Sequence, residues 1–390
     1  MSEKLTILKQ NGWRWHIVDA RLLDGWFDVW EKYCQEQCIK ANPVRKVFTV
    51  DGLFHVKLEE PAETFRKIRS MFRPKAQIEF NIGQALEDAG VNVVKHLGWA
   101  QNGSCNMLLT ASLSSSVSVH DYWMKEIVFG NGDSGIFLNK YAAFLKDFFA
   151  SGFFHPDFHS GNILYSLKND SFALVDVYGV SHPKGLSSKQ RKIHEHIVFD
   201  LKYGMNKEQA AEFILECGIK SDLSSAIRFW EEGLTVEYKR VKNSFPKRLR
   251  QISENYQKFV NRIEEEDRVF LLKRFPIGLP GINEIEIPDH LNGNHYDVVQ
   301  LPAEAANDLW TKSFLLNMLG FDHIQPIVFE EPNVLYFEKI PKATTEASAE
   351  DIAHFNEKAE MCGLKIVDTR LLRTANNRVL IEDIRQIGLT

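Results

Sequence analysis

The sequence predicts an α+β fold with a small β-rich N-terminal lobe and a helical lobe, followed by a further α+β unit. Three observations lead to this prediction: two β-rich runs around Asp51-Gly52, a long helical pattern from residue 187 to about 266, and a second set of strand and helix patterns that starts near residue 260. The predicted domain boundaries are residues 1–115, 116–255 and 256–390.

The composition is typical of a globular protein with buried cores. Hydrophobic residues make up 44% of the 390-residue chain, and the formal net charge is −5, which argues against a general nucleic-acid binder, so we expect no nucleic-acid partner. Five scattered cysteines favour reduced thiols over a disulfide framework and therefore a cytoplasmic location. Neither a secretory signal nor an apolar run long enough to cross a membrane is expected.

The N-terminal lobe is expected to begin with a strand at residues 13–18 and a helical stretch at residues 26–38, which would make Cys34 and Cys38 helical neighbours. A hairpin follows, because Asp51-Gly52 joins two runs rich in β-formers. The hairpin places Lys57 on its second strand.

A helix is predicted over residues 76–86, where apolar residues recur at helical spacing, and Glu79 falls in its first turns. A strand over residues 106–110 then leads into a polar stretch that contains Ser112, which we interpret as the connector between the lobes. Thr110 and Ser112 are assigned to nucleotide binding at this connector.

The helical lobe is expected to start with an amphipathic helix over residues 139–150, followed by a loop that carries Asp157 and Asn162. Residues 163–165 and 172–175 are predicted strands joined by a turn at residues 168–170. Such a hairpin brings Asn162 and Asp176 to the same end, so both side chains could reach one metal cluster.

These residue types suit the transfer of a phosphoryl group from ATP to a hydroxyl, a reaction that depends mainly on positioning and charge neutralisation. Lys57 would contact the α- and β-phosphates and be held by Glu79. Asn162 and Asp176 would coordinate Mg²⁺, which prefers hard oxygen ligands. Asp157 would orient the acceptor hydroxyl or accept its proton.

Two histidines lie in the same loop. His155 is assigned a supporting role in the catalytic loop, through hydrogen bonds to the backbone, and His159 is expected to pack or cap the loop. Neither histidine is the predicted base.

At these residues the chain resembles the protein-kinase-like superfamily, and within it the lipopolysaccharide core kinases of Gram-negative bacteria, which phosphorylate Kdo or heptose. The resemblance covers roughly residues 45–205. It includes the strand that leads to Lys57, the run Arg73-Pro74-Lys75-Ala76 before Glu79, the His155-Pro156-Asp157 loop, and the short passage from Asp176 to a helix at residues 186–191.

The resemblance implies a bilobal protein-kinase-like fold, ATP and Mg²⁺ as cofactors, and a sugar hydroxyl of a lipid-linked core oligosaccharide as acceptor. The short passage after Asp176 leaves no room for a long activation segment. Three positions depart from the protein-kinase pattern: Pro156 replaces an Arg, Val177-Tyr178-Gly179 replaces Phe-Gly, and no glycine-rich loop precedes Lys57. The backbone around residues 41–44 would have to cradle the phosphates instead.

Two alternatives remain open. One is a kinase that acts on protein Ser/Thr or on a small molecule. The other is a pseudokinase that binds nucleotide or a partner without turnover, which the three departures favour.

The C-terminal unit resembles a shortened repeat of the first. A strand at residues 268–273 matches the Lys57 strand, a helix at residues 303–319 matches the Glu79 helix, and a strand at residues 378–383 matches the strand before Asp176. Val367-Asp368 followed by Asn376 or Asn377 makes a poor catalytic loop, so this unit is predicted to be degenerate and regulatory. An unrelated α+β unit is an almost equal alternative.

Two basic runs, at residues 66–75 and 239–250, could draw the chain to an acidic inner-leaflet membrane surface. A solvated helix face is the simpler interpretation and is favoured for the second run. The first run lies beside the predicted nucleotide lobe and could equally serve phosphates.

Overall fold

The computed structural model describes residues 5–113, 115–128, 130, 132–253, 260–265, 268–273, 296–339, 344–366, 370–374 and 379–389. The chain is of the mixed α+β class, as predicted. It forms two compact units. The first unit comprises Met1–Tyr122, Asp133–Leu201 and Glu208–Ala226, and the second comprises Trp123–Gly132, Lys202–Lys207 and Ile227–Thr390.

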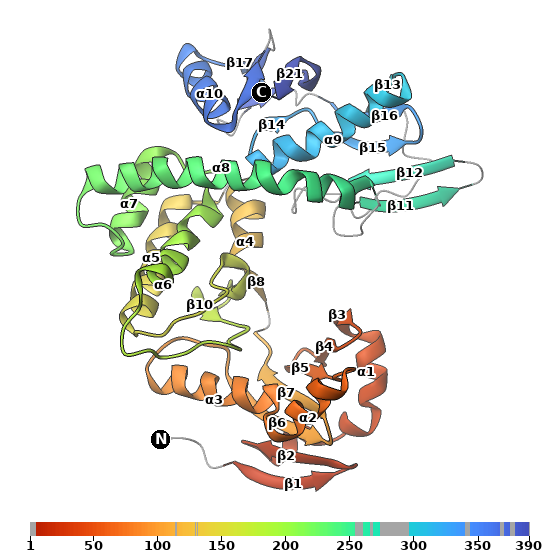
Figure 1. Cartoon of the computed structure of the whole chain (residues 1–390), viewed down its shortest axis with the longest axis vertical. Coiled ribbons are helices and arrows are strands. Elements are labelled where there is room, and N and C mark those ends of the chain that lie inside the picture. Colours follow the sequence, from red (N-terminus) through yellow and green to blue (C-terminus); the bar gives the residue numbers. More distant parts are fainter. Residues whose placement is uncertain are drawn as a thin grey trace. The chain divides into compact units, whose positions relative to one another are not determined.

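A seven-stranded antiparallel sheet forms the N-terminal part of the first unit (Figure 1). Its strand order is β1-β2-β6-β7-β5-β4-β3. The strands are β1 (Thr6–Gln10), β2 (Trp13–Ile17), β3 (Cys38–Asn42), β4 (Arg45–Val50), β5 (Phe54–Glu59), β6 (His96–Asn102) and β7 (Cys105–Ala111).

The two faces of this sheet pack against different helices. Phe54, Val56 and Leu58 alternate along β5 and are buried in one core together with Trp15 and Phe27, on the side that α1 (Trp30–Glu36) covers. The helix α3 (Lys75–Asp88) packs on β6 and β7. Because successive side chains of a strand point to opposite faces, Lys57 lies on the other face from Val56 and Leu58.

The hairpin prediction at Asp51-Gly52 is confirmed, because β4 pairs with β5 and both turn residues have positive φ angles of 49° and 67°. Leu53 lies in the turn instead of the strand. The prediction that Cys34 and Cys38 share a helix is wrong. The helix α1 ends at Glu36, and Cys38 starts the edge strand β3 opposite Phe48, so pairing with β4 overrides the helical pattern.

The rest of the first unit combines a small sheet with helices. The sheet has the order β10-β9-β8. Its strands are β8 (Ser116–Ser118), β9 (Ile163–Ser166) and β10 (Ser171–Leu174), and the helices are α2 (Thr64–Phe72), α4 (Val119–Tyr122), α5 (Ser134–Ala150), α6 (Ser188–Glu195) and α7 (Lys207–Glu216). The helix predicted over residues 139–150 is confirmed as α5. It begins earlier because the Asp133 carboxylate accepts a hydrogen bond from the Ile136 backbone and caps its first turn.

The second unit contains a five-stranded sheet and three long helices. The sheet order is β11-β12-β15-β16-β13. Its strands are β11 (Val260–Glu265), β12 (Arg268–Lys273), β13 (Tyr296–Gln300), β15 (Pro326–Glu330) and β16 (Val334–Glu338). The helices are α8 (Leu223–Ser253), α9 (Ala303–Leu319) and α10 (Ala349–Cys362), and the short strands are β14 (Asp322–His323), β17 (Thr345–Glu346), β18 (Leu364–Ile366), β19 (Leu371–Arg373), β20 (Val379–Ile381) and β21 (Ile387–Leu389).

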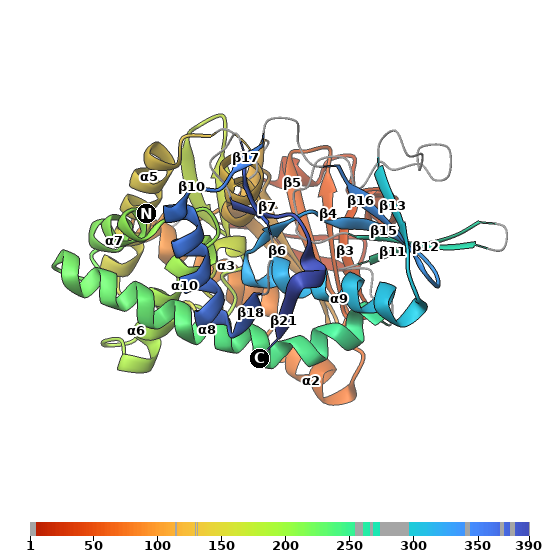
Figure 2. The same cartoon turned by 90° about the horizontal axis from the view of Figure 1, so that it is seen from above.

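A shared apolar core joins α8 and α9, which run side by side in both views (Figures 1 and 2). Tyr238 of α8 packs in this core with Trp310 and Phe314 of α9. The helical pattern expected to reach about residue 266 is wrong at its end, because residues 260–265 form β11. That segment pairs along its whole length with β12, and Val260 is fully buried.

The predicted repeat is matched in part. The strand assigned as the counterpart of β5 is β12, but β13 lies between β12 and α9 in sequence. β13 pairs with β16, and the order β15-β16-β13 matches the order β6-β7-β5 of the first sheet. Asp383, the counterpart of Asp176, caps a short helical turn and pairs with Arg385 at 2.6 Å. A shortened repeat and an unrelated α+β unit both stay predictions. Val367, Asp368, Asn376 and Asn377 lie outside the described residues.

No helix in the described part of the chain has both the length and the apolar character needed to cross a membrane.

Candidate functional site

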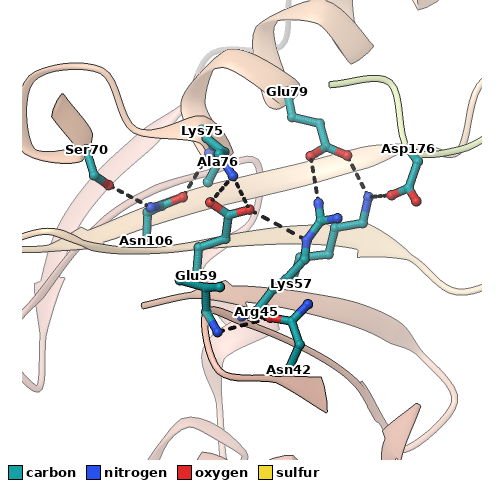
Figure 3. Close-up of polar contacts among 11 residues, drawn as sticks. Asn42, Arg45, Lys57, Glu59, Ser70, Lys75, Ala76, Glu79, Asn106 and Asp176 are labelled. Carbon is teal, nitrogen blue, oxygen red and sulfur yellow. Dashed lines mark hydrogen bonds and ion pairs between the residues drawn. The ribbon is translucent and has the colours of Figure 1, made fainter. Parts of the chain in front are cut away.

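Lys57 and Glu79 form the ion pair that the sequence predicts. The Lys57 Nζ atom of β5 lies 2.6 Å from Glu79 Oε1, on the second turn of α3 (Figure 3). The Glu79 side chain is only 4% exposed, and its other oxygen faces a second cation, with Arg45 Nη2 at 3.8 Å from Oε2. A buried carboxylate requires such compensation, because an unpaired charge in the interior is costly.

Two features fix α3 on the sheet. The buried Asn106 side chain of β7 accepts a hydrogen bond from the Ala76 backbone N–H over 3.0 Å, which satisfies a free donor in the first turn of α3. Its amide nitrogen also donates to Ser70 Oγ of α2 over 3.0 Å (Figure 3). Further along α3, Gly83 permits close contact with β6, because a Cβ atom there would lie 2.2 Å from the His96 ring.

The loop that carries Asp157 is held by two buried histidines. The His155 ring nitrogen Nδ1 accepts a hydrogen bond from the Asp157 backbone over 3.1 Å, and the His155 backbone donates to His194 Nε2 over 3.1 Å. Burial lowers the pKa of His155 and of His194 to about 4 each, so both rings are neutral and can accept these bonds at pH 7. The Asp157 carboxylate itself is 81% exposed. His155 therefore has the structural, loop-supporting contacts that the sequence analysis assigned to it.

The hairpin that carries Asn162 and Asp176 is confirmed. Ile163 of β9 pairs with Leu174 of β10, and the Val175 backbone donates to the Asn162 carbonyl over 2.9 Å. The Asn162 side chain donates through Nδ2 to the Asp157 carbonyl over 3.0 Å. His159 caps the turn before the hairpin by accepting from the Gly161 backbone, which confirms its capping role.

Asp176 completes the cluster. Its backbone has a φ angle of 53°, in the left-handed region, and its half-exposed carboxylate forms an ion pair with the Lys57 ammonium. Burial raises the pKa of the Asp176 carboxyl, but the opposing effect of Lys57, with smaller contributions from Arg45 and Lys40, leaves the pKa below its usual value. Asp176 is therefore a carboxylate at pH 7.

The donor set fits a magnesium ion. Because Asn162 Nδ2 is bound to the Asp157 carbonyl, the amide oxygen is the atom left for a cation, and Asp176 supplies an ionised oxygen ligand. Mg²⁺ in phosphoryl-transfer sites is typically held by one or two protein oxygens, with water and phosphate as its other ligands. Within the described ranges, no three His, Cys, Asp or Glu side chains form a metal-binding group.

Thr110 and Ser112 lie at the end of β7 and just beyond it. Thr110 is buried opposite His55 and His96 in the neighbouring strands. The Ser112 backbone donates to the Leu53 carbonyl over 2.9 Å, and its hydroxyl lies 3.5 Å from His55 Nε2. Among the residues described, no hydrogen bond connects Thr110 or Ser112 to the predicted site residues Lys57, Glu79, Asp157, Asn162 or Asp176. Their assignment to nucleotide binding stays a prediction.

The turn between β3 and β4 offers little to a phosphate through its backbone. Asn42 Oδ1 accepts from the Val44 and Arg45 N–H groups, over 3.0 and 2.7 Å, and Pro43 has no N–H to donate. The predicted backbone cradle at residues 41–44 is therefore largely used by the turn itself. The side chain of Arg45 instead brings a guanidinium to the cluster.

Sequence analysis missed four residues that shape the site: Arg45, Asn106, His194 and Asp200. Asp200 Oδ2 accepts a hydrogen bond from the Ser160 backbone over 2.7 Å and so supports the loop between Asp157 and Asn162. Arg45 carries a weak signal, because alternation along β4 places it on the Lys57 face. The other three act through contacts between residues far apart in sequence, which no local pattern reveals.

Comparison of the chain with protein-family models gave no match, and comparison with curated proteins gave none either.

Proposed function

We propose that the chain is an ATP-dependent and Mg²⁺-dependent kinase of the protein-kinase-like superfamily, which transfers the γ-phosphate to a hydroxyl of a lipopolysaccharide inner-core sugar, Kdo or heptose. One observation carries the proposal. Lys57 pairs with both Glu79 and Asp176, residues more than 90 positions apart in sequence, and Asn162 is bound to the backbone of Asp157 beside them.

This arrangement supports kinase chemistry because its residue types pair as they do in protein kinases. In protein kinases a strand lysine is paired with a helix glutamate, and an aspartate and an asparagine bind the metal ions. Here Lys57 lies on the third strand of the meander β3-β4-β5, and Glu79 lies on α3, which lies between β5 and β6 in sequence. In the proposed bilobal fold, the seven-stranded sheet with α3 and the part with β8, β9 and β10 would together hold the nucleotide.

The proposed mechanism assigns each side chain one task. Lys57 would leave Asp176 and bind the α- and β-phosphates, with Glu79 keeping its ammonium in place. Asn162 and Asp176 would hold Mg²⁺, which neutralises the charge on the phosphates. Asp157, exposed and acidic, would orient the acceptor hydroxyl and accept its proton. The buried neutral rings of His155 and His194 would keep the loop in position.

The acceptor is proposed from the resemblance and from the length of one segment. Only residues 177–187 separate Asp176 from α6, whose start is fixed by a capping box between Ser187 and Gln190. So short a segment cannot build the long activation segment of a protein Ser/Thr kinase. A lipid-linked core oligosaccharide would place the enzyme at the cytoplasmic face of the inner membrane, and small-molecule acceptors remain the competing hypothesis.

Turnover of ATP by the purified chain tests the catalytic part of the proposal. We expect Mg²⁺-dependent turnover that Asp157→Ala abolishes while ATP binding is retained, because this side chain is exposed and contributes little to the fold. Asp147→Ala, on an exposed position of α5, serves as the matched control and should keep wild-type turnover. Wild-type turnover no greater than that of Asp157→Ala would exclude an enzyme.

Mass spectrometry of core oligosaccharide tests the acceptor. A strain that lacks the protein should lose one phosphate from its inner core. An unchanged phosphate count in that strain would refute the lipopolysaccharide acceptor and leave the small-molecule hypothesis.

A pseudokinase is the second candidate, and one observation favours it. The Asn42 side chain occupies the backbone N–H groups of Val44 and Arg45 that could otherwise bind phosphate. Pro156 in place of the usual Arg, and Val177-Tyr178-Gly179 in place of Phe-Gly, support the same interpretation. Thermal stabilisation by Mg²⁺ and ATP without any turnover would be its signature.

A further inference from the structure

The helix α2 carries its apolar side chains outward. Four of its residues are large, hydrophobic and strongly exposed: Phe65 at 77%, Ile68 at 51%, Met71 at 51% and Phe72 at 80%. Within α2 only Ser70 is buried. Single exposed hydrophobic residues are ordinary, but four on one short helix mark a contact surface.

Polar contacts hold the opposite side of α2 against the sheet. Ser70 Oγ donates to the Ser104 carbonyl over 2.6 Å and accepts from Asn106. Gln101 Nε2 donates to the Met71 carbonyl over 3.0 Å. A normal surface helix turns its apolar side toward the core and its polar side toward solvent. α2 does the opposite, because its hydrogen-bonding side faces the sheet and its apolar side faces solvent.

Cations border the apolar face on both sides. At about 100° per residue, the four apolar residues Phe65, Ile68, Met71 and Phe72 fall within an arc of about 120°, and Lys67 and Arg69 each lie about 40° beyond one edge of it. Arg66 lies toward the back of the helix, and Arg73 follows its last residue. Glu63, the residue before the helix, is an acid that pairs with Arg66 at 3.2 Å.

We propose that α2 docks onto an anionic lipid bilayer, with its apolar side chains inserted at the acyl boundary and Lys67 and Arg69 at the headgroups. An apolar face bordered by Lys and Arg is the pattern of helices that lie in the membrane interface. The positive border complements acidic headgroups, whereas an apolar protein partner would not require it. This docking rests on the proposed function for its purpose. It names the surface through which the chain would reach a lipid-linked acceptor.

Cosedimentation with vesicles tests this proposal without nucleotide or acceptor. The wild-type chain should bind vesicles made of equal parts phosphatidylglycerol and phosphatidylcholine, bind pure phosphatidylcholine more weakly, and release as salt rises. The double variant Phe65→Ser/Phe72→Ser should lower vesicle affinity at least about tenfold. The double variant Lys67→Gln/Arg69→Gln should lower it about fivefold for each lost cation at low salt.

Matched variants keep the outcome interpretable. Leu53→Ser removes an equally exposed apolar side chain, 69% exposed in the β4–β5 turn, and should bind vesicles like the wild type. Asp157→Ala should also bind vesicles like the wild type. If the wild-type chain binds vesicles but does not turn over ATP, the result refutes the proposed kinase activity and leaves the docking proposal standing. The docking proposal is overturned if the wild type ignores anionic vesicles or if Phe65→Ser/Phe72→Ser binds them equally well. It is also overturned if light scattering shows a wild-type dimer that this variant dissociates, because a second copy then covers the face.

Discussion

The Asn162 amide nitrogen donates to the Asp157 backbone carbonyl over 3.0 Å, which ties the candidate metal ligand to the candidate base. This hydrogen bond thus affects the position of both side chains. It orients the Asn162 oxygen away from the loop, and it fixes the backbone from which the exposed Asp157 carboxylate projects. The two residues should therefore respond to mutation as a coupled pair.

Replacing Asn162 separates its two tasks. Asn162→Ala removes the metal ligand and the hydrogen bond, and we expect the Mg²⁺ concentration for half-maximal turnover to rise about 10- to 100-fold. Asn162→Asp keeps an oxygen ligand but replaces the donor by a charged oxygen that faces the Asp157 carbonyl, so the rise should be smaller while kcat falls. A magnesium titration of turnover measures both, and an unchanged Mg²⁺ requirement in Asn162→Ala would contradict the assignment.

Removal of the Arg45 guanidinium should weaken ATP binding. Arg45→Gln removes the second cation beside Glu79 and one of the cations near Asp176, so KM for ATP should rise about tenfold with little change in kcat. Lys46→Gln is the control, because Lys46 pairs with Glu60 at the surface. Equal KM values for the two variants would show that Arg45 does not meet the phosphates.

Gly83 is required for the close packing of α3 on β6. In Gly83→Ala the new methyl group would meet the His96 ring at 2.2 Å, and we expect the free energy of unfolding to fall by about 1–3 kcal/mol. Gly185→Ala should leave it nearly unchanged, because nothing lies within 4 Å of a Cβ atom there. Urea unfolding curves of the two variants provide the comparison, and equal midpoints would rule out the predicted clash.

Stability should fall as the pH is lowered from about 6.5 to 4. Burial lowers the pKa of His194 and of His155 to about 4 in the folded chain, so between these pH values the unfolded chain binds more protons than the folded one. Each ring then costs on the order of 1–3 kcal/mol at the acid end. His194→Gln keeps an acceptor for the His155 backbone and should flatten the pH dependence of urea unfolding, whereas a slope equal to that of the wild type would show that His194 does not titrate there.

Local patterns predicted the hairpin at Asp51-Gly52, the Glu79 helix and the hairpin between Asn162 and Asp176, because turn residues and periodicity act over a few neighbours. The ion pair between Lys57 and Glu79 could be predicted from the order of the strand and the helix along the chain. Cys38 was placed wrongly because an edge strand overrode a helical pattern.

Contacts between distant residues could not be predicted in the same way. The His194 ring accepts its bond from a residue 39 positions earlier, and nothing in its own helix indicates that role. The basic run before Glu79 was visible in the sequence, but its apolar residues would ordinarily be expected to face a core. Their outward direction depends on Ser70 and its partners in the sheet.

Asn106 contacts two consecutive helices. Its amide nitrogen contacts Ser70 of α2, and its amide oxygen contacts the Ala76 backbone of α3, one turn before Glu79. Both helices therefore share one buried anchor on β7. In Asn106→Leu both hydrogen bonds would be lost, and we expect α2 and α3 to loosen together on the sheet.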